Sequence, residues 1–362
     1  MNNNNKNIKK SIASANINFL IGSGVSAPFL ETLTDIEKQL SAAEGLGMLS
    51  KEITIKKDYF EKSIYKNIRL IVPVRSASGI QKSQQSEEFC QTLNGMQELQ
   101  QYKKFYKIIN ALILQRESSL LSKQVNIFTT NIDIFSEIAL EEAGIEFNDG
   151  FHGRFNPKYN IGNFKKSYYK TSLHYENTSE IPVFNIIKLH GSVSWRAEGK
   201  NIKLDKDLKL VFEIKDSLNN EGAKFKENYD KLMIVNPSKK KFKDTVLNET
   251  HYDLLRIYNN ELEKENSVLF VMGFSFADEH IRELTLRVAN TNPTSIVYIF
   301  AHDQDSKIYK KLENDAKNSN ICLLTAKKYD FEEINKFFAG QLNKECQIPR
   351  DNTEISQQKN DK

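Results

Sequence analysis

The chain has 362 residues, of which 39% are hydrophobic, and its 51 basic and 47 acidic residues leave a formal net charge of +4. This length can bury the core of one large domain or two modest ones. The dispersed, nearly balanced charges argue against a dedicated nucleic-acid surface. No apolar stretch approaches the roughly 20 residues of a membrane span, and the polar start is no signal peptide. The three cysteines form no Cys-x-x-Cys pair, which argues against a disulfide framework. We therefore expect a cytoplasmic protein.

The two ends of the chain differ from its middle. Residues 1–12 are rich in Asn and Lys, and residues 347–362 contain almost no apolar side chain, so we expect two disordered tails. Residues 13–346 form the predicted domain. Within it, residues 34–122 contain helical periodicity and no convincing strand, which predicts a helical insertion. Its apolar content exceeds what a lid needs, so we expect part of it to be buried in a homo-oligomer or against a partner.

The first strand-like run, residues 16–21, leads directly into the segment Gly22-Ser23-Gly24-Val25-Ser26-Ala27. Glycine at positions 22 and 24 permits a tight turn and the close approach of a pyrophosphate. The small Ala27 allows the next helix to lie near the sheet with its N-terminus toward the anion. Gly22, Ser23 and Gly24 are therefore predicted to hold a dinucleotide phosphate, although such a turn also fits an ordinary strand-to-helix connection.

Short β-branched or aromatic runs recur along the rest of the chain, and each is apolar nearly throughout, as expected of strands that are covered on both faces. They span residues 125–128, 184–189, 232–235, 268–272, 295–300 and 321–324. Helical patterns at residues 134–143 and 254–265 alternate with them, and residues 329–342 place four apolar side chains on one helical face. The sequence therefore predicts an α/β fold with a Rossmann-like, mostly parallel sheet, a helical insertion and a closing helix.

Polar or glycine-containing segments follow five of these strands. They are residues 22–24, 129–133, 190–192, 236–238 and 273–278. Ligands of open α/β sheets bind outside the carboxyl ends of the strands, so the five segments together indicate a site. Each also has a purely structural explanation. Asn131, Asp133, Ser275 and Asp278 can cap helices, and His190 can bond to a backbone carbonyl.

The ordered segments 22–26, 129–133, 189–191 and 273–275 resemble the NAD-binding and catalytic motifs of sirtuins. Residues 143–151, 188–195 and 273–281 more closely resemble the bacterial sirtuin-like NAD hydrolase domains of antiphage defence systems, and the resemblance covers about residues 16–300. It implies that NAD is the substrate and that NAD is depleted during infection, as in abortive infection. It also implies a separately encoded partner, such as a HerA-type ATPase or an Argonaute-like protein, through which alone nucleic acid would be engaged.

The motifs assign roles to individual residues. The resemblance adds four residues to the NAD-binding set: Ser26, Thr129, Gly273 and Ser275. Asn131 is suited to orienting the ribose or a water, and His190 can accept a proton at neutral pH. Asp133 is predicted to stabilise the positive charge that develops on the ribose or to orient the sugar. His152 is a weaker second histidine, because it does not follow a strand.

Departures from the sirtuin pattern narrow the activity. Deacylases of the family carry paired cysteines after the catalytic histidine, whereas residues 196–244 contain none, so we expect no zinc. An arginine-containing stretch of the deacylases is replaced here by residues 28–32. Peptide deacylation is therefore disfavoured. A deacylase or ADP-ribosyltransferase stays an alternative, as does an NAD- or ADP-ribose-binding regulatory subunit. A dehydrogenase is disfavoured, because the acidic residues near position 40 lie in a helix-like segment.

Overall fold

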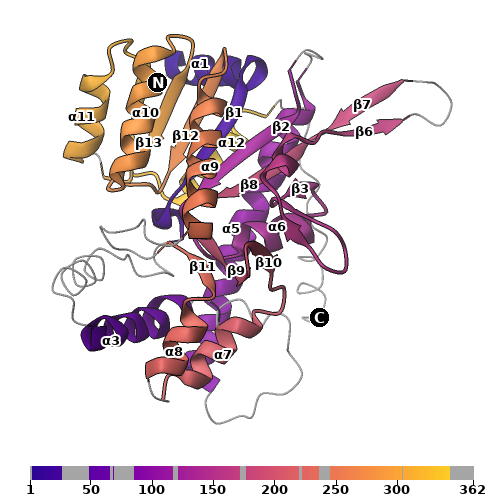
Figure 1. The fold of residues 1–362 in the computed structure, drawn as a ribbon. Helices are drawn as coiled ribbons and strands as arrows, with labels where there is room; N and C mark the ends of the chain where they lie inside the picture. The colour runs from indigo at the N-terminus through magenta and orange to yellow at the C-terminus, as the bar shows by residue number, and fades with distance from the viewer. Residues whose placement is uncertain are drawn as a thin grey trace, which may run out of the picture.

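The computed structural model describes residues 2–26, 49–65, 68, 85–116, 121–171, 177–219, 222–235, 245–303 and 305–342. At its centre is a seven-stranded sheet in the order β14-β13-β12-β1-β2-β8-β3, with every neighbouring pair parallel (Figure 1). Its strands are β1 (Asn16–Ile21), β2 (Gln124–Thr129), β3 (Phe147–Asn148), β8 (Val183–Lys188), β12 (Ser267–Met272), β13 (Ile296–Phe300) and β14 (Ile321–Leu324). The predicted α/β class with a Rossmann-like parallel sheet is confirmed.

The strand order creates a topological switch point next to β1. Strands β2 and β8 are added on one side of β1, and strands β12, β13 and β14 are added on the other. Crossover connections therefore leave β1 and β12 in opposite directions. In open sheets of this kind, ligands bind in the crevice at the carboxyl ends of the two strands that flank the switch.

Helices cover both faces of the sheet, and successive side chains of each strand enter two different cores (Figure 1). Phe19 and Ile21 belong to one core, whereas Leu20 and Val271 belong to the other. The first core is covered by α1 (Asn2–Ser14), α5 (Gln85–Leu114), α6 (Phe135–Ala143) and α12 (Phe331–Ala339). The second is covered by α9 (Thr245–Leu262), α10 (Glu279–Thr291) and α11 (Lys307–Asp315). Because both faces of the parallel sheet are buried, its strands are apolar nearly throughout.

A buried row of asparagines aligns three central strands. Asn18, Asn126 and Asn185 lie opposite one another in β1, β2 and β8. The Asn126 amide nitrogen donates to Asn18 Oδ1 and to Glu261 Oε2, both at 2.9 Å, and Asn185 Nδ2 donates to Asn126 Oδ1 at 2.9 Å. A slip of one residue would leave these amides buried without partners. The row therefore fixes the register that brings the strand ends to one edge.

A second, antiparallel sheet has the order β11-β9-β10-β5-β4. Its strands are β4 (Phe151–His152), β5 (Lys158–Tyr159), β9 (Gly191–Glu198), β10 (Asn201–Leu204) and β11 (Leu232–Ile234). The prediction that residues 232–235 belong to the parallel sheet is wrong, because β11 pairs with β9. Gly191 has a φ of 76° and turns the chain from β8 into β9, and a Cβ there would lie 2.0 Å from the Met233 carbonyl oxygen. Apolarity alone does not distinguish the two kinds of sheet.

The remaining elements form a small helical lobe and a projecting hairpin (Figure 1). The lobe contains α3 (Leu49–Tyr59), the π-helix η2 (Phe60–Tyr65), α7 (Lys209–Ser217) and α8 (Gly222–Tyr229). Its core includes Phe60 and Phe225, whose ring centroids lie 6.4 Å apart. The hairpin consists of β6 (Tyr168–Thr171) and β7 (Thr178–Ile181), and the short 3-10 segment η4 (Ile161–Lys165) precedes it. Within the described part of residues 34–122, the regular elements are helices.

The N-terminal segment differs from the disordered tail expected for residues 1–12. It forms α1, in which Ile8 and Ile12 lie one turn apart and are buried in the core. The Arg116 guanidinium donates to the carbonyls of Ile12 and Ala15 at 2.8 and 2.7 Å, which satisfies the C-terminal end of the helix. The burial of two isoleucines at helical spacing thus favours a packed helix despite the polar composition of this segment. The predicted tail at 347–362 lies outside the described residues.

Candidate active site

The glycine turn and the end of β12 form one closely packed unit. Gly22 N donates to Met272 O at 3.0 Å, and Gly24 N donates to Gly273 O at 2.8 Å. A Cβ added to Gly22 or Gly24 would lie 2.6 or 2.8 Å from the Gly273 carbonyl oxygen. Glycine is therefore required by the contact between the two loops. Replacing Gly24 would disturb this contact as well as the approach of a phosphate.

The two serines of the turn have different surroundings. Ser23 is exposed and begins the 3-10 segment η1 (Ser23–Val25). Ser26 is fully buried, and its Oγ lies 3.1 Å from the hydroxyl of Tyr102 on α5. Ser26 therefore fastens the turn to the core. The helix expected after Ala27 lies outside the described residues.

The loop after β12 is anchored by aromatic side chains. Phe274 and Phe276 are buried with their ring centroids 5.0 Å apart, and the Tyr309 hydroxyl donates to Phe274 O at 2.8 Å. Arg282 Nη1 donates to Phe276 O at 3.0 Å. Phe276 has a φ of 57°, in the left-handed region that is strained for a bulky residue. These contacts hold Ser275, which is exposed, at the carboxyl edge of the sheet.

The end of β2 is bonded directly to the end of β1. Thr129 Oγ1 donates to Ile21 O at 3.0 Å and accepts from Asn131 N at 3.0 Å. The Asn131 side chain then donates from Nδ2 to Gly22 O at 3.3 Å. Because the amide nitrogen is used on the turn, Oδ1 is the atom of Asn131 that can accept from a ligand. Thr129 and Asn131 are both buried and therefore well positioned.

His190 follows β8 and pairs with a residue from the opposite side of the switch point. Its Nε2 lies 3.1 Å from Asp278 Oδ2, while Asp278 Oδ1 accepts from His280 N and Ile281 N at the start of α10. A carboxylate only accepts hydrogen bonds, so the proton lies on Nε2 and the lone pair of the neutral ring lies on Nδ1. The expected cap is present at Asp278, but its pairing with His190 was missed by sequence reasoning.

Asp133 lies behind the strand ends and has an exposed fraction of 4%. Its Oδ1 accepts from Phe135 N at 3.0 Å, just before the start of α6, although the N-cap position itself is Ile134. Lys188 Nζ donates to the Asp133 carbonyl oxygen and lies 3.2 Å from Glu137 Oε1. Together with Glu98 of α5, these residues form a buried charge cluster (Glu98, Asp133, Glu137 and Lys188).

Burial governs the protonation of this cluster. It raises the pKa of Asp133 and of Glu137, and the nearby Lys188 ammonium partly opposes both shifts. Burial, followed by the charge of Asp133, raises the pKa of Glu98 to about 8. Among the described residues, one carboxyl oxygen of each of these three acids is buried without a hydrogen-bond partner. The cluster therefore contains three carboxyl groups but a single ammonium group.

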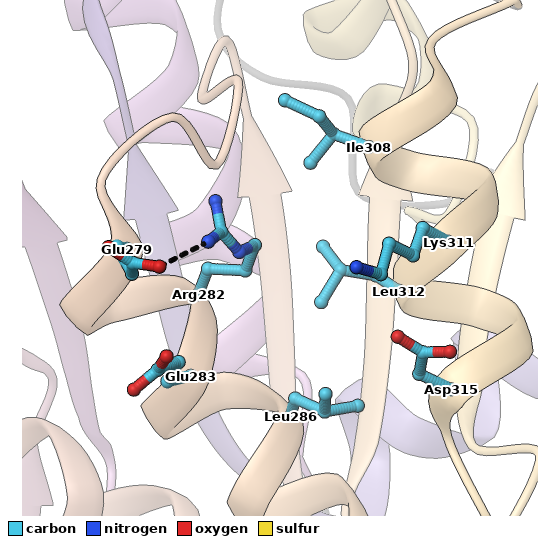
Figure 2. A pocket seen from close by; sticks show the side chains of 8 residues that line it. All are labelled: Glu279, Arg282, Glu283, Leu286, Ile308, Lys311, Leu312 and Asp315. Carbon is cyan, nitrogen blue, oxygen red and sulfur yellow. Dashed lines mark hydrogen bonds and ion pairs between the residues drawn. The ribbon is translucent and has the colours of Figure 1, made fainter.

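His152 lies in a different environment from His190. It is exposed on β4 of the antiparallel sheet, and its Nδ1 lies 3.0 Å from Lys158 O on β5. A separate groove of about 420 Å³ lies between α10 and α11 and is lined on its apolar part by Leu286, Ile308 and Leu312 (Figure 2). The Glu279–Arg282 ion pair lies on the α10 side of it (Figure 2). None of the predicted site residues lines this groove.

Four strand ends are thus joined by a continuous set of hydrogen bonds. The bonds run from Gly24 to Gly273, from Asn131 to Gly22, from Leu189 N to Thr129 O at 2.8 Å, and from His190 to Asp278. A family model described as the SIR2-like domain matches residues 125–324. The chain belongs to this family. The match runs from β2 to β14, so it includes Asn131, His190 and Asp278.

The sirtuin resemblance is confirmed at the level of the SIR2-like family, which is consistent with an NAD-using enzyme. The match excludes the Gly22 turn, which the hydrogen bonds above connect to the SIR2-like region. No curated protein matches the chain. No described helix of this SIR2-like protein is long and apolar enough to cross a membrane. Among the described residues, no three His, Cys, Asp or Glu side chains are grouped so that they could hold a metal ion.

Proposed function

We propose that this SIR2-like protein hydrolyses NAD at the bond between nicotinamide and ribose. The observation that supports this most directly is the hydrogen-bonded connection of the glycine turn, Asn131 and the His190–Asp278 pair at one edge of the sheet. The glycine backbone permits a pyrophosphate to approach beside the switch point. The His190 imidazole and the Asn131 amide lie at the neighbouring strand ends, where we expect the nicotinamide ribose of an NAD whose pyrophosphate is bound at the turn.

The chemistry requires one proton acceptor and precise orientation. Nicotinamide leaves as a neutral pyridine with the bonding electron pair, and positive charge develops on the ribose carbon. A water oxygen bonds to that carbon, so NAD⁺ and water yield nicotinamide, ADP-ribose and a proton. His190 Nδ1 accepts the proton, while Asp278 holds Nε2–H and stabilises the imidazolium. Asn131 Oδ1 accepts from a ribose hydroxyl or from the water.

We assign the other predicted residues to binding and support. Ser23 and Ser275 are exposed at the edge and are proposed to contact the phosphate and adenosine portions of NAD. Thr129 and Ser26 hold the loops from beneath. Asp133 is buried and its Oδ1 accepts from Phe135 N, so its proposed role changes from contact with the ribose to support of the Asn131 loop.

Chromatography of NAD incubated with the purified protein tests the proposal. The wild type should release nicotinamide and ADP-ribose, and Asn131→Ala and His190→Ala should each lower turnover by about 10²–10⁴-fold. His152→Ala is the matched histidine control and should leave turnover unchanged. Full turnover in His190→Ala together with loss in His152→Ala would contradict the assignment. Tight NAD binding without turnover in the wild type would favour a regulatory subunit instead.

Asp278→Asn tests the orientation of His190 separately. Asparagine is an equally good cap for α10, so the helix should be preserved. Its amide can donate as well as accept, and it therefore no longer fixes the proton on His190 Nε2. We expect turnover to fall by about 10²–10⁴-fold, as when a buried triad carboxylate is replaced by an amide. Unchanged turnover would remove Asp278 from the mechanism.

We further propose that the reaction depletes cellular NAD in antiphage defence, as an oligomer or with a separately encoded ATPase or Argonaute-like partner. The support is the resemblance of residues 143–151, 188–195 and 273–281 to defence domains, together with family membership. Bacteria expressing the wild type should lose NAD after phage infection, whereas cells expressing His190→Ala should not. Stable NAD levels with every candidate partner would contradict a defence role.

A further inference from the structure

A second histidine lies beside His190 and comes from a different helix. His251 on α9 is 6% exposed, and its ring centroid lies 6.2 Å from that of His190, with the ring planes inclined by 46°. His251 Nδ1 lies 2.8 Å from the carbonyl oxygen of Leu189. A carbonyl only accepts, so His251 Nδ1 donates this bond. None of the sequence motifs included His251.

The bonded carbonyl belongs to the peptide unit that carries the nitrogen of His190. Leu189 N continues the sheet by donating to Thr129 O, and beyond this point β8 has ended. On the other side of His190, its own carbonyl accepts from Val235 N at 2.9 Å. The peptide units before and after His190 are therefore both held, the first of them by His251. Rotation of the Leu189–His190 peptide would swing the His190 ring relative to Asp278.

Helix α9 is itself firmly packed. Leu254, Tyr258 and Leu262 follow His251 at helical spacing, and all four side chains are buried. The Tyr258 ring packs edge-on against Phe128 with centroids 4.9 Å apart, and its hydroxyl lies 2.7 Å from Thr285 Oγ1 of α10. The same helix pair therefore supplies both groups that adjoin the His190 ring. Asp278 comes from the cap of α10, and His251 comes from α9.

We propose that His251 is a positioning residue for His190. Its hydrogen bond to Leu189 O and its ring beside the His190 ring keep His190 Nε2 on Asp278, so that Nδ1 is the nitrogen presented to the reaction. The kinetic consequence rests on the proposed function. The geometry of the His190 side chain does not rest on that function, and it can be measured in the absence of turnover.

Three variants separate positioning from packing. His251→Leu keeps much of the buried volume and removes the donor, whereas His251→Asn restores a side-chain N–H donor. Tyr258→Phe is the matched control, because it removes a buried hydrogen bond of α9 without touching His190. We expect His251→Leu to lower kcat by about 10–10²-fold and to change the KM for NAD by less than about twofold. His251→Asn should recover most of kcat, and Tyr258→Phe should lower Tm with kcat unchanged.

Nitrogen-15 spectra of labelled histidines supply a readout besides activity. The wild type and His251→Asn should show His190 with its proton on Nε2, and His251→Leu should show a mixture of tautomers. The proposal is overturned if His251→Leu retains both kcat and a single tautomer, or if Tyr258→Phe loses as much kcat as His251→Leu for a similar fall in Tm. If the wild type cleaves no NAD, the proposed function fails, and the spectra alone decide whether His251 positions His190.

Discussion

The carboxyl edge of the parallel sheet consists of two regions that are held together in different ways. Where β1 meets β12, the contacts are made by backbone atoms of Gly22, Gly24 and Gly273, and a Cβ on any of the three would lie only 2.2–2.8 Å from the backbone of the other loop. Where β2 meets β8, the strand ends rest on the buried charge cluster. The packing of the first region therefore depends on the small volume of its glycines, and the stability of the second depends on the pairing of its charged side chains.

This difference matches what each region is proposed to do. A glycine backbone permits a phosphate to come close. The charge cluster instead joins the two proposed catalytic loops, because Asp133 lies two residues after Asn131 and Lys188 lies two residues before His190. Burying charge is unfavourable unless it is paired, so this connection holds only while Lys188 has its partners. Four variants test the contrast, from the largest expected effect to the smallest.

Lys188→Met should produce the largest loss of stability in the charged region. Lys188 is 2% exposed, and its loss leaves the buried Asp133 and the partly buried Glu137 without a cation, for which we expect a destabilisation of about 3–5 kcal/mol at about pH 8. The loss should shrink at about pH 5, where the carboxyls are protonated more easily. Chemical denaturation at both pH values measures it. The control is Lys203→Met, whose pair with Glu198 is exposed and should contribute about 0–1 kcal/mol.

Gly273→Ala tests the volume dependence of the other region. Its φ is 58°, and an added Cβ would lie 2.2 Å from Val25 N. Gly144→Ala is the matched control, because Gly144 has a φ of 63° and no neighbour within 4 Å of its added Cβ. Gly144→Ala should lower the free energy of unfolding by about 1 kcal/mol, and Gly273→Ala by about 3 kcal/mol or more. Equal losses would show that the close loop contact has no energetic importance.

The pH dependence of stability should reveal Glu98. Its pKa of about 8 in the folded protein exceeds the ordinary value of 4.5, so between these values the folded state binds more protons than the unfolded state. The free energy of unfolding should therefore fall by a few kcal/mol as pH rises through this window and level off above it. Glu98→Gln should flatten the slope. The raised pKa values of Asp133 and Glu137 give the same sign and should leave a smaller slope in the variant.

Ser26→Ala should have the smallest effect. It removes the hydrogen bond to Tyr102 and should lower the free energy of unfolding by about 1 kcal/mol, equally at about pH 5 and pH 8. Calorimetric titration of NAD should show unchanged affinity if Ser26 only fastens the turn. Weaker NAD binding without a loss of stability would instead support the contact that the motif resemblance implies.

Much of the fold could be predicted because its signals are local. Strands β1, β2, β8, β12, β13 and β14 are apolar nearly throughout, and Phe331, Ile334 and Phe338 mark the buried face of α12. Asn131 and His190 followed from the same logic, since parallel strands bring their carboxyl ends to one edge. Strand β11 was assigned to the wrong sheet, because a buried apolar run looks the same whether the strand pairs in a parallel or an antiparallel sheet.

The sequence by itself thus determined six strands of the parallel core, the helix that closes it and the residues that follow those strands. Only the tertiary structure decided which of those residues meet. Asp278 bonds to His190 across 88 residues, and His251 bonds to Leu189 across 62. Asp133 and His190 both follow strands, yet one is buried with Lys188 and the other is paired at the edge. Periodicity records which face of an element is buried, whereas the packing of α9 and α10 on the sheet selects the partners.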